Sequence, residues 1–150
     1  MRPSEVLRSD HAILRSQLTA LERQLTNPDA TSFALSRLMD ALAERLRCHT
    51  EYEERLWDAH CCAPEFLESL HDDHENQRTR LAVLHTLLAD VGPISEAQVL
   101  AQAAGFIHDL RRHMALEEAV FFSDLEMGFV GHAGVAVKGP EACPIGRTPG

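Results

Sequence analysis

Apolar residues recur at steps of three and four along most of the chain, which is the spacing of one face of an α-helix. Short stretches that contain Pro, Gly or paired Cys interrupt this pattern at residues 27–29, 61–64 and 92–93. The pattern therefore predicts helices over residues 4–25, 32–59, 64–89 and 95–127, the last with Ser95 as its N-cap. Four helices of this length with short connections favour an all-α, antiparallel up-down-up-down four-helix bundle.

The end of the chain has a different composition. Residues 128–150 hold six of the eight Gly and three of the seven Pro. We therefore divide the chain into a bundle at 1–127 and a Gly/Pro-rich C-terminal tail at 128–150, which we expect to be irregular and to contribute no catalytic element.

The two halves of the bundle repeat each other. An Asp-His pair at 10–11 recurs at 73–74, and a His-x-x-x-Glu-Glu motif at 49–54 recurs at 113–118. The offset is 63 residues for the first motif and 64 for the second. The second hairpin therefore looks like a duplicate of the first, and the residues that they share are polar ones.

Six of these polar residues interrupt the apolar stripes. Each helix places one His in its stripe, and the second and fourth helices add a Glu four residues later, on the same face. Each His also lies at a similar number of residues from the turns beside it, so antiparallel packing brings all four to one height within about one helical turn. The predicted layer consists of His11, His49, Glu53, His74, His113 and Glu117.

Burying these groups is costly unless they are paired or bind metal. Four imidazoles and two carboxylates can satisfy two metal ions, with two His on each ion and both Glu bridging. This donor set suits iron, and also manganese or zinc, while the lack of thiolates in the layer argues against an iron–sulfur cluster. The alternative from the same residues is a hydrogen-bonded His/Glu network without metal. A ferritin-like site would carry Glu-x-x-His, which is the reverse order.

Composition and charge narrow the classes of partner. The formal net charge of −9 argues against a protein that binds nucleic acid phosphates. No apolar run is long enough to span a membrane, and the first residues do not resemble a signal peptide. The four Cys form neither a CxxC pair nor a zinc-binding spacing. We expect a cytoplasmic protein with reduced thiols and with neither a nucleic acid nor a membrane as partner; the protein partner and oligomeric state are left open.

The two His-x-x-x-Glu motifs and the two further His resemble the hemerythrin-like, or HHE cation-binding, domains over about residues 4–127. This resemblance implies a carboxylate-bridged, non-haem di-iron centre. On the family pattern His11 and His49 would bind one iron, and His74 and His113 would bind the other. Both Glu53 and Glu117 would bridge the two ions.

The chain departs from the oxygen-carrying members. Those carriers have a fifth His four residues from the third-helix His, where this chain has Leu70 and Arg78, and they have Asp in place of Glu117. The pattern is closer to four-His, two-Glu members that handle iron, nitric oxide or redox signals. Fewer ligands leave more positions for a small molecule, which favours reactivity over reversible oxygen carriage. His71, three residues before His74, is left open as a replacement ligand.

We expect a binding protein whose di-iron centre meets oxygen, nitric oxide or peroxide, for sensing, scavenging or iron handling. No residue outside the ligand set resembles a general acid or base. One alternative is a di-iron enzyme of peroxidase-like, nitric-oxide-reducing or iron–sulfur-repair type, although repair proteins usually carry a further Cys-containing N-terminal domain for which we expect no room here. Another alternative is a structural bundle that is metal-free or binds zinc.

Several neighbouring residues receive simpler interpretations. We expect Asp10 and Asp73 to face solvent or another element, with a hydrogen bond to a His of another helix as the alternative. We expect Arg15 and Arg78 to pair with neighbouring acids at the surface, with a position that guards the edge of the site as the alternative. Tyr52, Trp57 and the other His are interpreted as packing, surface or boundary residues, and the Cys at 61–62 as a weak candidate for redox sensing. The apolar wall of the site is predicted to comprise Leu14, Leu18, Leu56, Phe106, Leu110, Val120 and Phe121.

Overall fold

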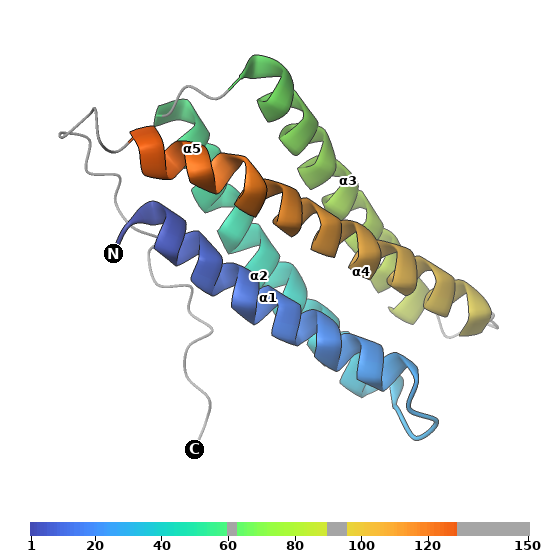
Figure 1. Ribbon diagram of the computed structural model, residues 1–150. Helices are drawn as coiled ribbons and strands as arrows, with labels where there is room; N and C mark the ends of the chain where they lie inside the picture. The colour runs from blue at the N-terminus through green and yellow to red at the C-terminus, as the bar shows by residue number, and fades with distance from the viewer. Residues whose placement is uncertain (60–62, 90–95, 129–150) are drawn as a thin grey trace.

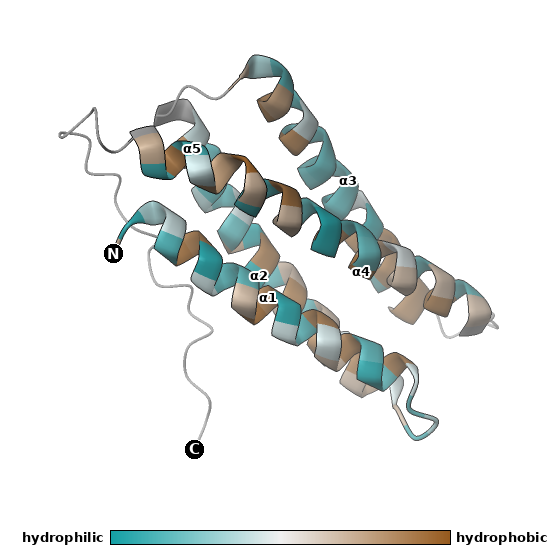
Figure 2. Ribbon diagram, in the orientation of Figure 1, coloured by the Kyte–Doolittle hydropathy of each residue, from teal (hydrophilic) through white to brown (hydrophobic). Residues whose placement is uncertain are grey.

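The segments with apolar residues at steps of three and four form long amphipathic helices. The computed structural model describes residues 1–59, 63–89 and 96–128, and within these ranges it contains helices and no strand (Figure 1). Hydrophobic and hydrophilic residues alternate around each helix, as Figure 2 shows. The helices are α1 (Pro3–Leu25), α2 (Ser32–Ala59), α3 (Pro64–Ala89), α4 (Glu96–Ala119) and the short α5 (Phe121–Gly128).

The four long helices pack as a ring in chain order. Helix α1 contacts α2 and α4, and α3 contacts the same two helices from the other side. Consecutive helices run in opposite directions because their connections are short (Figure 1). This arrangement confirms the predicted all-α, antiparallel four-helix bundle.

The predicted helix ends agree with the structure because local signals fix them. Helix α1 begins at Pro3, a residue suited to the first turn, and α2 begins after Thr31, whose Oγ1 accepts a hydrogen bond from Ala34 N at 3.1 Å. The predicted N-cap Ser95 lies outside the described residues. So does the predicted tail at 128–150 apart from Gly128, which is the last residue of α5.

The predicted last helix is divided at Val120. Hydrogen bonds from Val120 N to Leu116 O and from Asp124 N to Val120 O continue the helical pattern across the join, and α5 extends α4 in nearly the same direction (Figure 1). Beyond Glu117 the buried positions are Phe121, Phe122 and Leu125, while Val120 is 37% exposed. The placement of Val120 in the apolar wall was therefore wrong, because the buried stripe steps by four residues from Glu117 to Phe121 and Leu125 and leaves Val120 at its edge.

The apolar core forms two clusters on either side of a polar layer. The cluster that we call the turn-side cluster includes Leu14 of α1, Leu46 of α2, Leu81 of α3 and Leu110 of α4. The cluster that we call the terminal cluster includes Leu7, Leu56, Leu70 and Phe121 of α1, α2, α3 and α5, together with Tyr52 and Trp57. On α1, α2 and α3 the predicted His lies between residues of the two clusters, and on α4 it lies between Leu110 of the turn-side cluster and Phe121 of α5. The polar layer is therefore sealed from both ends of the bundle.

Candidate metal centre

The four predicted histidines form two pairs inside the bundle. His11 Nε2 lies 3.1 Å from His49 Nε2, and His74 Nε2 lies 3.1 Å from His113 Nε2. All four rings are buried. Two nitrogens that each lie about 2.1 Å from one ion can be no more than about 4.2 Å apart. The Nε2 separation of each pair is therefore compatible with two ligands of a single ion.

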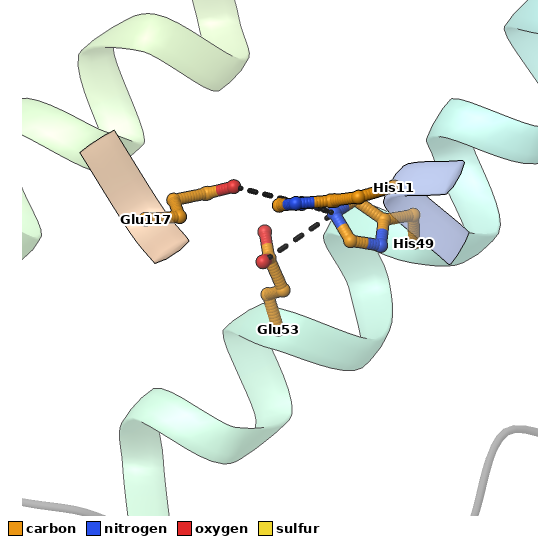
Figure 3. A group of neighbouring side chains, drawn as sticks. All are labelled: His11, His49, Glu53 and Glu117. Carbon is orange, nitrogen blue, oxygen red and sulfur yellow. Dashed lines mark hydrogen bonds and ion pairs between the residues drawn. The ribbon is translucent and has the colours of Figure 1, made fainter. Parts of the chain in front are cut away.

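The two predicted glutamates lie between the histidine pairs. Glu53 Oε1 is 3.4 Å from His49 Nε2, and its Oε2 is 3.4 Å from His74 Nε2. Glu117 divides its oxygens in the same way, with Oε2 at 3.2 Å from His11 Nε2 and Oε1 at 2.7 Å from His113 Nε2. Figure 3 shows both carboxylates directed toward the His11–His49 pair. Each glutamate thus presents one oxygen to each pair.

These contacts produce two overlapping groups of ligand atoms. In each group one atom from every residue lies within 4.8 Å of the others, and both groups contain Glu53 and Glu117. Both glutamates are fully buried, and none of their four oxygens meets the geometry of a hydrogen bond. Two buried carboxylates in this state are costly unless positive charge compensates them. The residues present therefore fit a site for two cations that share the carboxylates.

A second set of acids faces the outer nitrogens of the same histidines. His11 Nδ1 donates to Glu118 at 2.8 Å, His74 Nδ1 donates to Glu54 at 3.1 Å, and His113 Nδ1 donates to Asp73 at 3.0 Å. His49 Nδ1 lies 3.5 Å from Asp10 Oδ2, as an ion pair. Because a carboxylate only accepts, it favours the proton on Nδ1 and directs the Nε2 lone pair inward. We call Asp10, Glu54, Asp73 and Glu118 the outer acids.

The outer acids resolve an alternative that the sequence left open. Residues Asp10 and Asp73 do contact histidines of other helices rather than solvent alone. The predicted arginine pairing is also present, since Arg15 donates to Glu118 at 2.7 Å and Arg78 donates to Glu54 at 2.8 Å. These arginines thus contact the very acids that hold the histidines.

The close carboxylates control protonation of the layer. Burial alone lowers the pKa of His49, but Glu53, Asp10 and Glu117 outweigh it and raise that pKa to about 10. The same balance with Glu117 and Glu53 raises the pKa of His74 to about 9. Burial would raise the pKa of Glu117, but the close contacts of its oxygens with the imidazoles of His11, His113 and His74 hold that pKa well below its usual range. Without metal the layer is therefore held together by imidazolium and carboxylate charges.

Two aromatic rings pack on the histidines. Trp57 stacks on His74 with ring centroids 5.0 Å apart, and Phe122 lies 4.9 Å from His11. Both aromatic side chains are buried. The sequence interpretation of Trp57 as a packing residue agrees with this position, whereas it missed Phe122, for which the apolar run 120–122 was the only available signal.

The remaining histidines that the structure describes lie outside both ligand groups. His71 is exposed and meets the ring of Trp57 edge-on at 4.7 Å, so it is not placed as a fifth ligand here. His85 and His108 are partly or largely exposed and lie beside Asp40 and Asp109. The predictions for His60, His132, Cys61, Cys62 and Cys143 concern positions outside the described residues.

Comparison with known families gives one match. A family model described as the hemerythrin HHE cation binding domain matches residues 2–126. Comparison with curated proteins finds no match, and neither does comparison with solved structures. In the part of the chain that the structure describes, no helix has the length and apolar character needed to cross a membrane.

Proposed function

The chain belongs to the hemerythrin HHE cation-binding family, and on this premise we propose that its core holds two iron ions bridged by Glu53 and Glu117. His11 and His49 would bind one ion, and His74 and His113 the other. The observation that carries this proposal is the pair of fully buried carboxylates whose oxygens have no hydrogen-bond partner. Imidazole and carboxylate donors without thiolate suit iron, with manganese or zinc as the competing ions.

The ligand set supports interaction with a small molecule. Two His and two shared carboxylates leave each ion with fewer than six protein ligands, and the bound ions would supply redox chemistry toward oxygen, nitric oxide or peroxide. The surrounding residues have distinct tasks: the two apolar clusters exclude water, and the outer acids fix the histidine rings.

Binding is favoured over acid–base catalysis by the lack of a spare proton donor. Within the described residues, the buried titratable side chains are the six proposed ligands and Tyr52, which packs in the terminal cluster. We therefore propose a protein that senses or scavenges the small molecule, or that handles iron, in the cytoplasm.

Anaerobic titration of the metal-free protein with Fe²⁺ tests the proposal. We expect two irons per chain, an oxo-bridged visible spectrum after air oxidation, and loss of one or both irons in His74→Ala and His113→Ala. The matched control is His108→Ala, which removes an exposed histidine of α4 and should leave the iron content unchanged. Less than half an iron per chain, unaffected by the ligand substitutions, would contradict a di-iron centre. Retention of zinc alone from iron-rich medium would favour a structural zinc bundle.

A further inference from the structure

The layer of residues next to the histidines contains one polar exception. Each long helix contributes one residue to this layer, which lies three positions from the His on the side of the turn-side cluster: after the His on α1 and α3, and before it on α2 and α4. These residues are Leu14 on α1, Leu46 on α2, Gln77 on α3 and Leu110 on α4. All four are buried, with exposures between 0% and 4%. The internal repeat pairs Gln77 with Leu14, so an apolar residue fills the equivalent place in the other half.

The side-chain carbonyl oxygen of Gln77 is unpaired among the residues that the structure describes. This atom, Oε1, is also buried. Leaving such an acceptor unpaired destabilises the folded state, whereas leucine at the equivalent position carries no such penalty. A buried amide that lowers stability in the layer beside the ligand histidines points to a use in ligand binding.

A groove connects this amide to the surface. It lies between α2 and α3, has a volume of about 450 Å³, and includes His74 but none of the other three predicted ligand histidines. Its floor is made of buried residues, His74, Gln77, Leu46 and Leu81 among them, and exposed residues such as Arg78 and Ala82 lie at its rim. A water molecule occupies about 30 Å³ of liquid, so the groove has the volume to hold a small ligand beside Gln77, which is 4% exposed.

The unpaired Oε1 of Gln77 favours ligands that can donate a hydrogen bond. A carbonyl oxygen accepts hydrogen bonds and cannot donate them, so a ligand that pairs with Gln77 Oε1 must carry a proton on a polar atom. Hydrogen peroxide carries two O–H groups, while oxygen and nitric oxide carry none. We propose that Gln77 is a specificity-determining residue that binds hydrogen peroxide beside the His74–His113 pair, and that the peroxide arrives through the α2–α3 groove. This inference rests on the proposed di-iron function.

The first test replaces Gln77 in the iron-loaded protein. We expect Gln77→Leu to keep two irons, to weaken hydrogen peroxide binding about tenfold, as for the loss of one hydrogen bond, and to change azide binding less than twofold, because azide has no proton to offer Oε1. Binding is measured from the absorbance change immediately after rapid mixing, as a function of ligand concentration. The metal-free variant should melt at the same temperature as the wild type or higher, because it loses an unpaired amide.

The matched control is Gln17→Leu. Gln17 also has a buried Oε1 without a partner, but its Nε2 donates to Ala41 O at 3.5 Å and it lies outside both ligand groups. This variant should bind peroxide as the wild type does. The inference is overturned if Gln77→Leu binds peroxide normally, or if it loses iron, which would make Gln77 a metal ligand. Absence of iron from the wild type would instead refute the proposed function.

The second test narrows the groove without touching the amide. Ala82→Phe enlarges an exposed rim residue of the α2–α3 groove, and Ala104→Phe makes the same change in a separate groove between α1 and α4. We expect only Ala82→Phe to slow peroxide association, by about tenfold or more, with unchanged iron content. Equal association rates in the two variants would overturn the access route.

Discussion

Replacing Glu118 with glutamine tests whether the outer acids orient the histidines for metal. Glu118 Oε1 accepts hydrogen bonds from His11 Nδ1 at 2.8 Å and from Arg15 at 2.7 Å. Glutamine retains an acceptor of similar shape and loses the charge. A hydrogen bond to a charged group contributes about 1.5–3 kcal/mol and a neutral one about 0.5–1.5 kcal/mol, so the substitution removes about 1–1.5 kcal/mol. We therefore expect iron affinity to fall about tenfold, the lower end of the range for such residues because the carboxylate is 27% exposed.

The assay is anaerobic competition between the metal-free protein and a coloured chelator for Fe²⁺. Glu51→Gln is the control, because Glu51 is an exposed acid of α2 that pairs with Arg47 at 2.7 Å and contacts none of the four histidines of the layer. Urea unfolding of both metal-free variants checks that the bundle is intact. The reasoning is refuted if Glu118→Gln binds iron as tightly as the wild type, or if Glu51→Gln weakens binding as much.

Three further predictions concern stability and spectroscopy. The raised pKa values of His49 (about 10) and His74 (about 9) stabilise the metal-free fold fully below pH about 6.5, and this stabilisation is lost as the pH rises through 9–10. The lowered pKa of Glu117 stabilises the fold above pH about 4.5, and this contribution is lost as the pH falls further. Chelator-treated protein should therefore be most stable to urea between pH about 4.5 and 6.5. Unfolding free energies that stay constant from pH about 4.5 to about 10 would contradict this prediction. The single Trp57 stacks on His74, so its fluorescence should be quenched as iron binds and unresponsive in His74→Ala. Leu18→Ala should cost about 2–5 kcal/mol of unfolding free energy in urea melts while iron content stays the same, because Leu18 is fully buried in the turn-side cluster.

The sequence predicted those parts of the structure that depend on spacing along one helix. The i, i+4 spacing places His49 above Glu53, and Pro or Gly marks the helix ends, so the fold and the six layer residues followed from periodicity and repeat. Partners on different helices were less accessible. Asp10 is one residue from His11 and so points about 100° away from it, toward α2, where it meets His49. Whether a residue at this angle meets solvent or a histidine depends on how far the neighbouring helix is rotated, which sequence spacing does not give.

The failures have a similar physical origin. The predicted stripe stepped by three residues from Glu117 to Val120, whereas the buried stripe steps by four to Phe121 and leaves Val120 at its edge, and Phe122 is buried as well. Gln77 occupies a position of the buried face of α3, and its unpaired oxygen is visible only once the surrounding leucines are in place. The two errors thus concern which side of a helix is buried at Val120 and whether one atom of Gln77 has a hydrogen-bond partner. A hydrophobic pattern specifies neither.

The outer acids also show how the duplicated halves depend on each other. Asp10 of α1 holds the histidine of α2, and Asp73 of α3 holds that of α4, so each aspartate acts within its own hairpin. Glu54 of α2 holds the histidine of α3, and Glu118 of α4 holds that of α1, so each of these glutamates joins the two hairpins. The acids therefore form a closed ring in which every helix orients the histidine of the next. An isolated hairpin would contain two histidines and one central glutamate but would lack the acceptor for its first histidine. Duplication alone thus does not give two independent sites, because the contacts that orient the ligands are completed only when both halves are packed together.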